Sequence, residues 1–140
     1  KLEGILVRNQ DMESLLRHLN GRYSIACMVN LRTDSQRAIM VPDYFQKMLD
    51  AHDGSFKSAL HDYCERLVAS FCKDSFSLLM DYDFIHARVE SVGVLQYGYT
   101  RNDGEKFLLT IFADRRSKDE TMWVFSKDDL PQVELELFES

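Results

Sequence analysis

The sequence is poor in residues that form cross-links or bind metals. It holds three cysteines, Cys27, Cys64 and Cys72, and their spacing fits no zinc-binding pattern. An odd number of well-separated cysteines favours buried thiols in a reducing compartment over a disulfide framework. A domain of 140 residues buries roughly 65–70% of its unfolded surface and needs no such cross-links to fold. We therefore expect a cytoplasmic globular domain without a metal.

Long apolar runs are absent as well. No run approaches the ~20 residues of a membrane span, and no signal peptide is visible. The chain begins with Lys1 rather than Met, which indicates a fragment excised from a longer parent protein. We expect no membrane contact by this fragment, while the parent could carry an anchor or an output domain outside it.

Basic patches are also missing. Asp and Glu number 23 against 17 Lys and Arg, which gives a formal net charge of −6. The basic residues are scattered, and the nearest approach to a cluster is Arg115-Arg116. A surface that follows a nucleic-acid backbone needs Lys and Arg gathered on one face, so we expect no nucleic-acid partner.

Catalytic motifs are lacking too. The chain has no glycine-rich phosphate loop and no nucleophile elbow. Asp81 and Asp83 lie close together, but neighbouring acidic residues at a helix start are typical of capping charge. These absences predict a non-catalytic protein with no cofactor.

What the sequence does contain begins with an amphipathic N-terminal segment. Asn9 or Asp11 can cap a helix there, and Asn20-Gly21 supplies a C-terminal stop. Exposed apolar stripes of this kind usually find a partner, so the segment predicts a homodimer. The stripe consists of Met12, Leu15, Leu16 and Leu19.

A hairpin and several helices follow. Residues 23–31 alternate with the period of a strand that buries one face, and residues 36–41 form the return strand after a turn. Pro42 opens a short helix, and residues 74–90 are expected to form one or two further helical pieces. Ser55 starts the clearest helix. Its inward stripe consists of Phe56, Leu60, Tyr63, Cys64, Leu67, Val68 and Phe71.

Three apolar-rich strands are predicted at 92–101, 105–114 and 121–126, with Asn102-Asp103-Gly104 as a hairpin turn. Two strands, then helices, then three strands predict an α+β fold. In it, a five-stranded antiparallel sheet carries the helices on one face, and the N-terminal helix packs on the other face or on a second copy. The long helix and the first strand each have one apolar side to bury. We expect packing of Leu60, Tyr63 and Leu67 against Ile25, Cys27 and Val29.

The order of these parts comes with a set of local motifs. Tyr23–Leu31 is followed by a turn with Thr33 and Asp34, Pro42–Phe45 opens the helices, and Leu95–Glu105 holds two strands and their turn. On these motifs, from about residue 23 to 125, the chain resembles a PAS domain. It is most similar to the divergent PAS-like sensors found upstream of diguanylate cyclase (GGDEF) modules in bacterial signalling proteins.

The resemblance implies a PAS-like domain at 22–126, between an N-terminal linker or dimerisation helix at 1–21 and a tail at 127–140 that leads toward an output module. It implies a sensory role, in which a small molecule between sheet and helices stabilises one packing and the termini report it. The chain departs from the family after Phe125, where Ser126–Asp129 replaces the Asp-Ile-Thr-like triplet that couples to an output helix. The photosensor cysteine motif of flavin-binding members is also absent, so no cysteinyl adduct is expected.

Tyrosines mark the candidate ligand site. Tyr63 lies on the inward stripe of the long helix, and Tyr97 and Tyr99 share a strand face with Leu95. A buried tyrosine hydroxyl needs a partner, which a bound polar ligand, solvent or backbone can supply. Arg88 and Arg101 could reach a carboxylate ligand, although ordinary surface arginines are more common. The candidate ligand-binding residues are Tyr63, Leu67, Tyr97 and Tyr99.

Other clusters are weaker. His61, Cys64 and Glu65 are spaced for one helix face, but Cys64 points to the core, so the three do not converge on a metal. His86 and Glu90 form a surface pair. His61 and His86 are the positions that could serve as an axial haem ligand. Two rival functions stay open: a pure dimerisation module with a filled core, and a small NTF2-like α+β enzyme with an Asp and a His or Tyr converging in its cavity.

Overall fold

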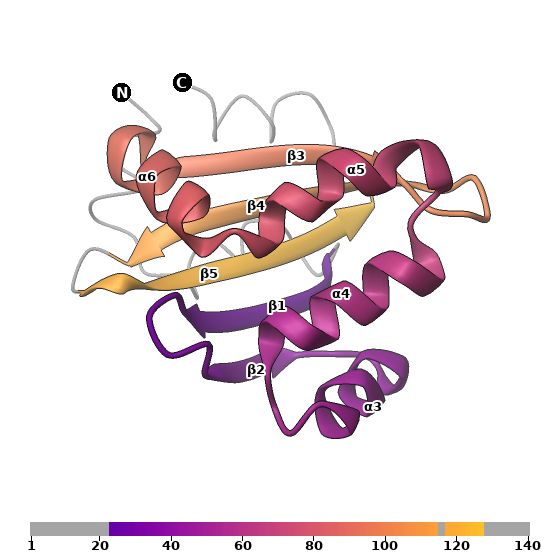
Figure 1. Cartoon of the computed structure of the whole chain (residues 1–140), viewed down its shortest axis with the longest axis horizontal. Helices are drawn as coiled ribbons and strands as arrows, with labels where there is room; N and C mark the ends of the chain where they lie inside the picture. The colour runs from indigo at the N-terminus through magenta and orange to yellow at the C-terminus, as the bar shows by residue number, and fades with distance from the viewer. Residues whose placement is uncertain (1–22, 115–116, 128–140) are drawn as a thin grey trace.

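The computed structural model describes residues 23–114 and 117–127 and confirms an α+β fold with a five-stranded antiparallel sheet (Figure 1). The strand order is β2-β1-β5-β4-β3, so β1 and β5, the first and last of the described strands, are neighbours inside the sheet. The strands are β1 (Tyr23–Asn30), β2 (Gln36–Met40), β3 (Val94–Thr100), β4 (Lys106–Asp114) and β5 (Ser117–Lys127).

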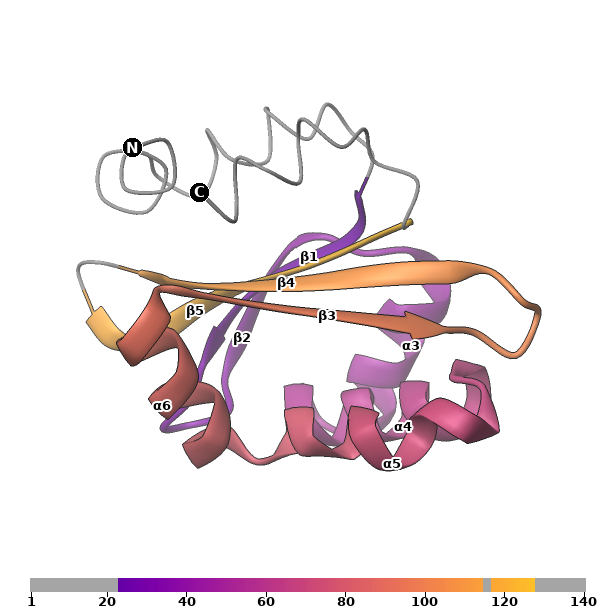
Figure 2. The same ribbon diagram turned by 90° about the horizontal axis from the view of Figure 1, so that it is seen from above.

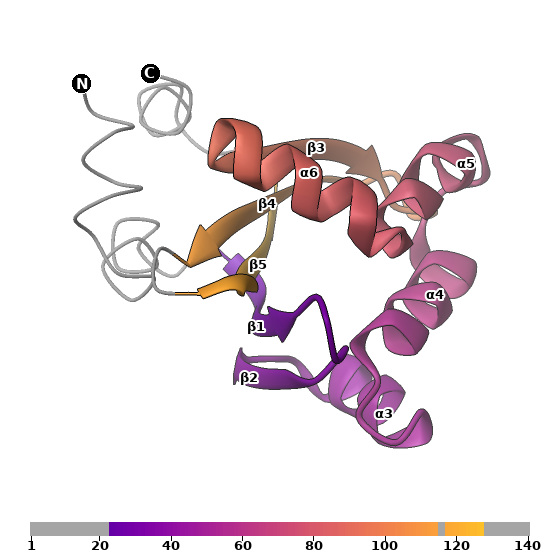
Figure 3. The same ribbon diagram turned by 60° about the vertical axis from the view of Figure 1, so that its left-hand side comes forward.

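The helices between β2 and β3 lie on one face of this sheet, as predicted (Figure 2). They follow one another along that face from α3 to α6 (Figure 3). They are α3 (Asp43–Ala51), α4 (Phe56–Leu67), α5 (Lys73–Phe76) and α6 (Tyr82–Val92), with the 3-10 turns η1 (Ser70–Cys72) and η2 (Ser77–Met80) on either side of α5.

Local signals in the sequence explain where α4 begins and where α6 begins and ends. The Ser55 side chain accepts a hydrogen bond from the backbone N–H of Ser58 and so caps α4. Asp81 caps α6 by accepting from the N–H groups of Asp83 and Phe84. Gly93 ends α6 with a φ of 94°, a left-handed conformation that a glycine adopts without a Cβ clash.

The core forms where the apolar stripe of α4 meets the sheet. Leu60 and Tyr63 are fully buried in one cluster with Ile25, Cys27 and Val29, which confirms the predicted packing. Leu67 is half-buried at the margin of this cluster. Aromatic rings fill much of the interior, and Phe56 packs edge-on against Trp123 with ring centroids 5.0 Å apart.

The predicted helix is too long at its C-terminal end. α4 ends at Leu67, and Phe71 is 79% exposed instead of lying on the inward stripe. The cause is tertiary: Val68 has an extended backbone and forms a β-bridge with Arg101. The N–H of Ala69 also donates to the carbonyl of Thr100, so the chain leaves the helix to join the end of β3.

Other boundaries shift by a few residues. The strand predicted from 92 begins at Val94, because α6 continues to Val92. The strand predicted from 121 begins at Ser117, where it pairs with Asp114. The expectation of one buried face in the first strand is wrong, because Ala26 and Met28 are buried as well as their core-facing neighbours. Strand β5, which pairs with β1 in the middle of the sheet, likewise has Met122 and Val124 buried on the face away from the helices.

Several predictions fall outside the described residues. These include the N-terminal helix with its dimerisation stripe of Met12, Leu15, Leu16 and Leu19, and the tail beyond 127. Within residues 23–114 and 117–127, no helix has both the length and the apolar character needed to cross a bilayer.

Candidate functional site

The candidate ligand residues come together where α4 packs against β3. The hydroxyls of Tyr63 and Tyr99 lie 2.5 Å apart, and the ring of Tyr97 stacks on that of Tyr99 with centroids 5.9 Å apart. Leu67, one helical turn beyond Tyr63, packs against the same core. The four residues chosen from the sequence therefore occupy one region of the fold.

Strand register sets the direction of these tyrosines. Tyr97 pairs with Leu109, and Tyr99 pairs with Phe107, both of which face the core. Because directly opposed residues of an antiparallel pair share a face, Tyr97 and Tyr99 point toward the helices. Gln96 and Gly98 consequently point to the other side of the sheet.

The hydroxyls of this cluster have protein partners. Arg101 donates from Nε to the Tyr63 hydroxyl at 3.2 Å and from Nη2 to the Tyr44 hydroxyl at 2.6 Å. The Tyr97 hydroxyl lies 2.5 Å from the Ser75 hydroxyl. The Tyr97 hydroxyl also donates to the backbone carbonyl of Cys72 at 3.4 Å. The tyrosine hydroxyls are therefore partnered by other side chains and, for Tyr97, by the backbone as well.

The phenols of Tyr63 and Tyr99 stay protonated at neutral pH because the protein raises the pKa of both. Burial raises the pKa of Tyr63, and the nearby positive charge of Arg101 lowers it in part. Burial and the neighbouring Tyr63 hold the pKa of Tyr99 well above its ordinary value. Burial disfavours the charged form of Arg101, but its contacts with Tyr63 and Tyr44 outweigh this and raise its pKa. The site therefore combines a permanent cation with neutral hydroxyl groups.

Aromatic faces surround the guanidinium. The Arg101 Cζ lies 4.1 Å from the ring centroid of Phe107, 5.3 Å from that of Tyr63 and 5.5 Å from that of Tyr44. These distances are within the range of cation–π attraction. We define the Arg101 cluster as Arg101 with Tyr44, Tyr63, Tyr99 and Phe107.

Sequence reasoning named Arg101 as one of two possible carboxylate ligands and did not select Tyr44. A signal for Arg101 was present, because Tyr97, Tyr99 and Arg101 stand two residues apart and so share one strand face. The place of Tyr44 depends on how α3 packs beside α4, which no local pattern reveals. Arg88, the other candidate, is exposed on α6.

The remaining clusters do not assemble into a metal site. His61 and Glu65 are exposed while Cys64 is buried, so the helix spacing separates them as expected. Within residues 23–114 and 117–127, no group of His, Cys, Asp and Glu side chains has a geometry that could hold a metal ion. His86 is half-buried and Glu90 is exposed.

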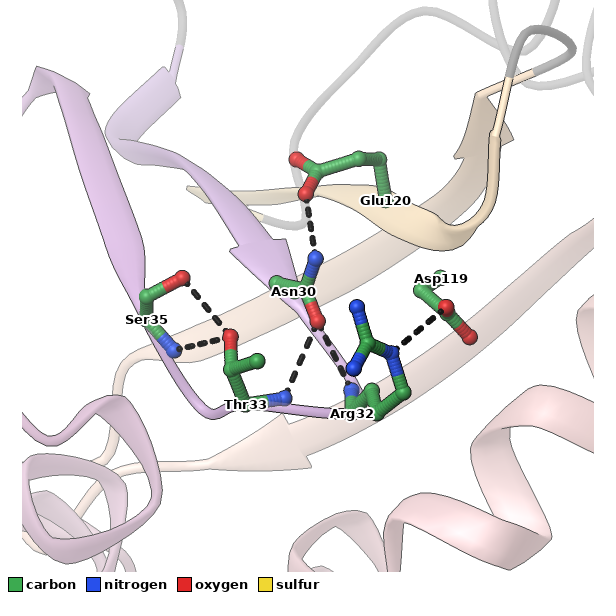
Figure 4. Close-up of polar contacts among 6 residues, drawn as sticks. All are labelled: Asn30, Arg32, Thr33, Ser35, Asp119 and Glu120. Carbon is green, nitrogen blue, oxygen red and sulfur yellow. Dashed lines mark hydrogen bonds and ion pairs between the residues drawn. The ribbon is translucent and has the colours of Figure 1, made fainter.

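A cavity of about 250 Å³ lies at the far end of the fold, where β1 and β5 meet the start of α6. Its rim includes an ion pair between Arg32 Nε and Asp119 at 3.2 Å, beside the turn ordered by Asn30 (Figure 4). In the described chain no hydrogen bond joins His86 to a carboxylate, whereas Tyr82, which lines the cavity, donates its hydroxyl hydrogen bond to the Asp34 carboxylate. The lining residues are Leu31, Arg32, Tyr82, Asp83, His86 and Asp119.

Beside this cavity, Asp34 connects the β1–β2 turn to α4 and α6 through hydrogen bonds. This half-buried residue in the β1–β2 turn accepts hydrogen bonds from the Ser55 hydroxyl, the Lys57 backbone N–H and the Tyr82 hydroxyl. Its φ of 64° lies in the left-handed region, where Asp is better tolerated than most residues. The sequence predicted the turn but not these long-range contacts, which join the first hairpin to α4 and α6.

Comparisons with protein-family models, curated proteins and solved structures find no match.

Proposed function

We propose that this chain is a non-catalytic, PAS-like sensory domain of a bacterial multidomain signalling protein. In this proposal a small organic molecule binds at the Arg101 cluster, and the domain passes the binding event to a downstream signalling domain in the same parent chain. The observation that carries the proposal is the Arg101 cluster itself: a cation and three hydroxyls where α3 and α4 meet the end of β3, at the margin of an apolar core.

The composition of this cluster argues for binding rather than for stability. Phenylalanine would fill the space of Tyr63 and Tyr99 without burying a hydroxyl, and burying polar groups adds a desolvation cost that hydrogen bonds at best offset. Binding sites, in contrast, combine apolar walls with a few polar groups that orient a ligand. The Arg101 cluster has this composition.

The position of the cluster suits a conformational response. Tyr63 belongs to α4, Tyr44 to α3, and Tyr99 to β3, so a ligand that contacts Arg101 touches the helical layer and the sheet at once. A ligand that prefers one arrangement of these layers shifts the population toward it. The chain after β5 is the route to the expected output module.

A thermal-shift screen of metabolites tests this proposal. A ligand should raise the melting temperature by mass action, and the shift should shrink in Tyr63→Phe and Tyr99→Phe. Tyr23→Phe is the matched control, because Tyr23 lies in β1 and makes none of the contacts of the Arg101 cluster. Shifts that are equal in all three variants would place the binding site elsewhere and overturn the proposal.

A second candidate function is a pure association module. The observation that favours it is the filled core, in which the Tyr63, Tyr97 and Tyr99 hydroxyls already have protein partners. Light scattering of the full chain tests it, with Leu15→Glu and Leu19→Glu on the predicted dimerisation stripe. If the wild-type protein is a dimer and the double variant is a monomer, association through this stripe is supported. If the wild-type protein and the double variant are both monomers, this function is ruled out.

A further inference from the structure

Arg101 differs from Arg32, Arg66 and Lys127 in having no carboxylate partner among the described residues. Arg32 pairs with Asp119, Arg66 with Asp62, and Lys127 with Glu105. The described partners of the Arg101 side chain are phenols and aromatic rings alone. A half-buried guanidinium that meets no counter-charge keeps most of its capacity to attract an anion.

The phenols fix the orientation of this guanidinium and leave one edge open. Nε and one N–H of Nη2 are occupied by Tyr63 and Tyr44. Nη1 donates to no described acceptor, and it is not among the buried side-chain atoms that lack a partner. Nη1 of the half-buried Arg101 therefore keeps some contact with solvent. Together with the second N–H of Nη2, its N–H groups form the edge that binds both oxygens of a carboxylate.

The walls of the site indicate the remainder of the ligand. Phe107 packs against the guanidinium plane, and the rings of Tyr44 and Tyr63 flank it. Tyr63 and Phe107 are buried and Tyr44 is half-buried, so Tyr44 is the ring of this set that can contact an apolar or aromatic body. The protonated Tyr63 adds no competing negative charge. A single cation balances a single carboxylate, whereas a phosphate dianion would leave a charge uncompensated.

We infer that the Arg101 cluster binds a small organic monocarboxylate with an apolar or aromatic body, and that Arg101 is its anion-binding residue. This inference rests on the proposed function and names the class of ligand. The carboxylate pairs with the guanidinium, and the body of the ligand packs on the half-buried ring of Tyr44 in α3.

Matched pairs of carboxylates and neutral amides test the inference. The probes are benzoate, phenylacetate and hexanoate against benzamide, phenylacetamide and hexanamide, at constant ionic strength. We expect the carboxylates alone to raise the melting temperature and to move the Arg101 Nε–H resonance in ¹H–¹⁵N spectra. Affinity from titration calorimetry should fall about tenfold or more in Arg101→Gln, and less in Arg101→Lys, which keeps the charge but loses the planar fork.

Two further variants separate binding from folding. Arg37→Gln removes an exposed arginine from the edge strand β2 and should leave affinity unchanged. Tyr44→Phe keeps the cation but frees Nη2, so it should weaken binding severalfold while the backbone spectrum stays native. Equal affinity for acids and amides, equal losses in Arg101→Gln and Arg37→Gln, or tighter binding of inorganic phosphate would each overturn the inference.

The test also distinguishes this inference from the proposed function. If a neutral metabolite binds and its shift shrinks in Tyr63→Phe and Tyr99→Phe while no carboxylate binds, the ligand class is wrong and the sensory site stands. If neither the carboxylates nor any compound of the wider screen binds, both are overturned.

Discussion

Replacing Asp34 by alanine should release the β1–β2 turn from α4 and α6. The carboxylate accepts from three donors, and the largest loss falls on Tyr82, because this residue is only 7% exposed. A hydrogen bond to a charged group contributes about 1.5–3 kcal/mol. Water can replace the lost acceptor of the Ser55 hydroxyl and of the Lys57 backbone N–H. Each of these two donors therefore loses about 0.5 kcal/mol of stabilisation.

We therefore expect Asp34→Ala to lower the free energy of unfolding by about 3 kcal/mol. Asp34→Gly removes the same acceptor but suits the φ of 64°, so it should recover about 1 kcal/mol of this loss. Asp34→Asn keeps one acceptor oxygen and should fall between Asp34→Ala and the wild-type protein. Urea titration followed by fluorescence reports all three, because the single tryptophan, Trp123, is fully buried.

Asp53→Ala is the matched control. Asp53 is also an aspartate with a positive φ, of 56°, but it is exposed, and in the described part of the chain its carboxylate accepts no hydrogen bond. Its replacement should change the free energy of unfolding by less than about 1 kcal/mol. If Asp34→Ala costs no more than Asp53→Ala, the three hydrogen bonds add nothing net and the reasoning fails.

Three further predictions concern the core. Leu60→Ala should cost about 2–5 kcal/mol because Leu60 is fully buried, while Leu67→Ala should cost about 1 kcal/mol at its half-buried position; equal costs in urea titrations would contradict the packing described. Burial raises the pKa of Cys27 from 9.0 to about 12, and it raises that of Tyr63 and Tyr99. The fold favours the neutral forms, so their contribution is complete below pH 9 and is lost as the pH rises toward 12. Urea midpoints at pH 8 and pH 10.5 should show this fall, and Cys27→Ala should reduce it. A thiol reagent at pH 8 should label the half-buried Cys72 in the native protein but Cys27 only after unfolding, and rapid labelling of native Cys27 would refute its burial.

Much of the fold could be predicted because its signals are local. The alternation of residues 23–31 identified the core-facing side of β1, and the apolar stripe of α4 identified the residues that meet it. The end of α4 could not be predicted in this way. No glycine or proline stands after Leu67, and the stop comes from the pairing of Val68 with Arg101, which is remote in sequence.

The same distinction applies to the candidate site. Tyr63, Tyr97 and Tyr99 were found because each lies on a face that its own element buries. Tyr44 was missed because its role depends on Arg101, which reaches it across the fold at 2.6 Å. Periodicity shows which way a side chain points, but it does not show which distant side chain it meets.

The bridge between Val68 and Arg101 also has an evolutionary consequence. The backbone of residues 67–69 is held by hydrogen bonds to residues 100–102, so the end of α4 keeps its place whatever the chain does next. Lengthening a loop adds closure entropy only slowly, by about 0.6 kcal/mol for each doubling. The exposed turn that begins at Ser70 is therefore a place where insertions and deletions can accumulate among descendants of this chain without displacing Tyr63 or Arg101.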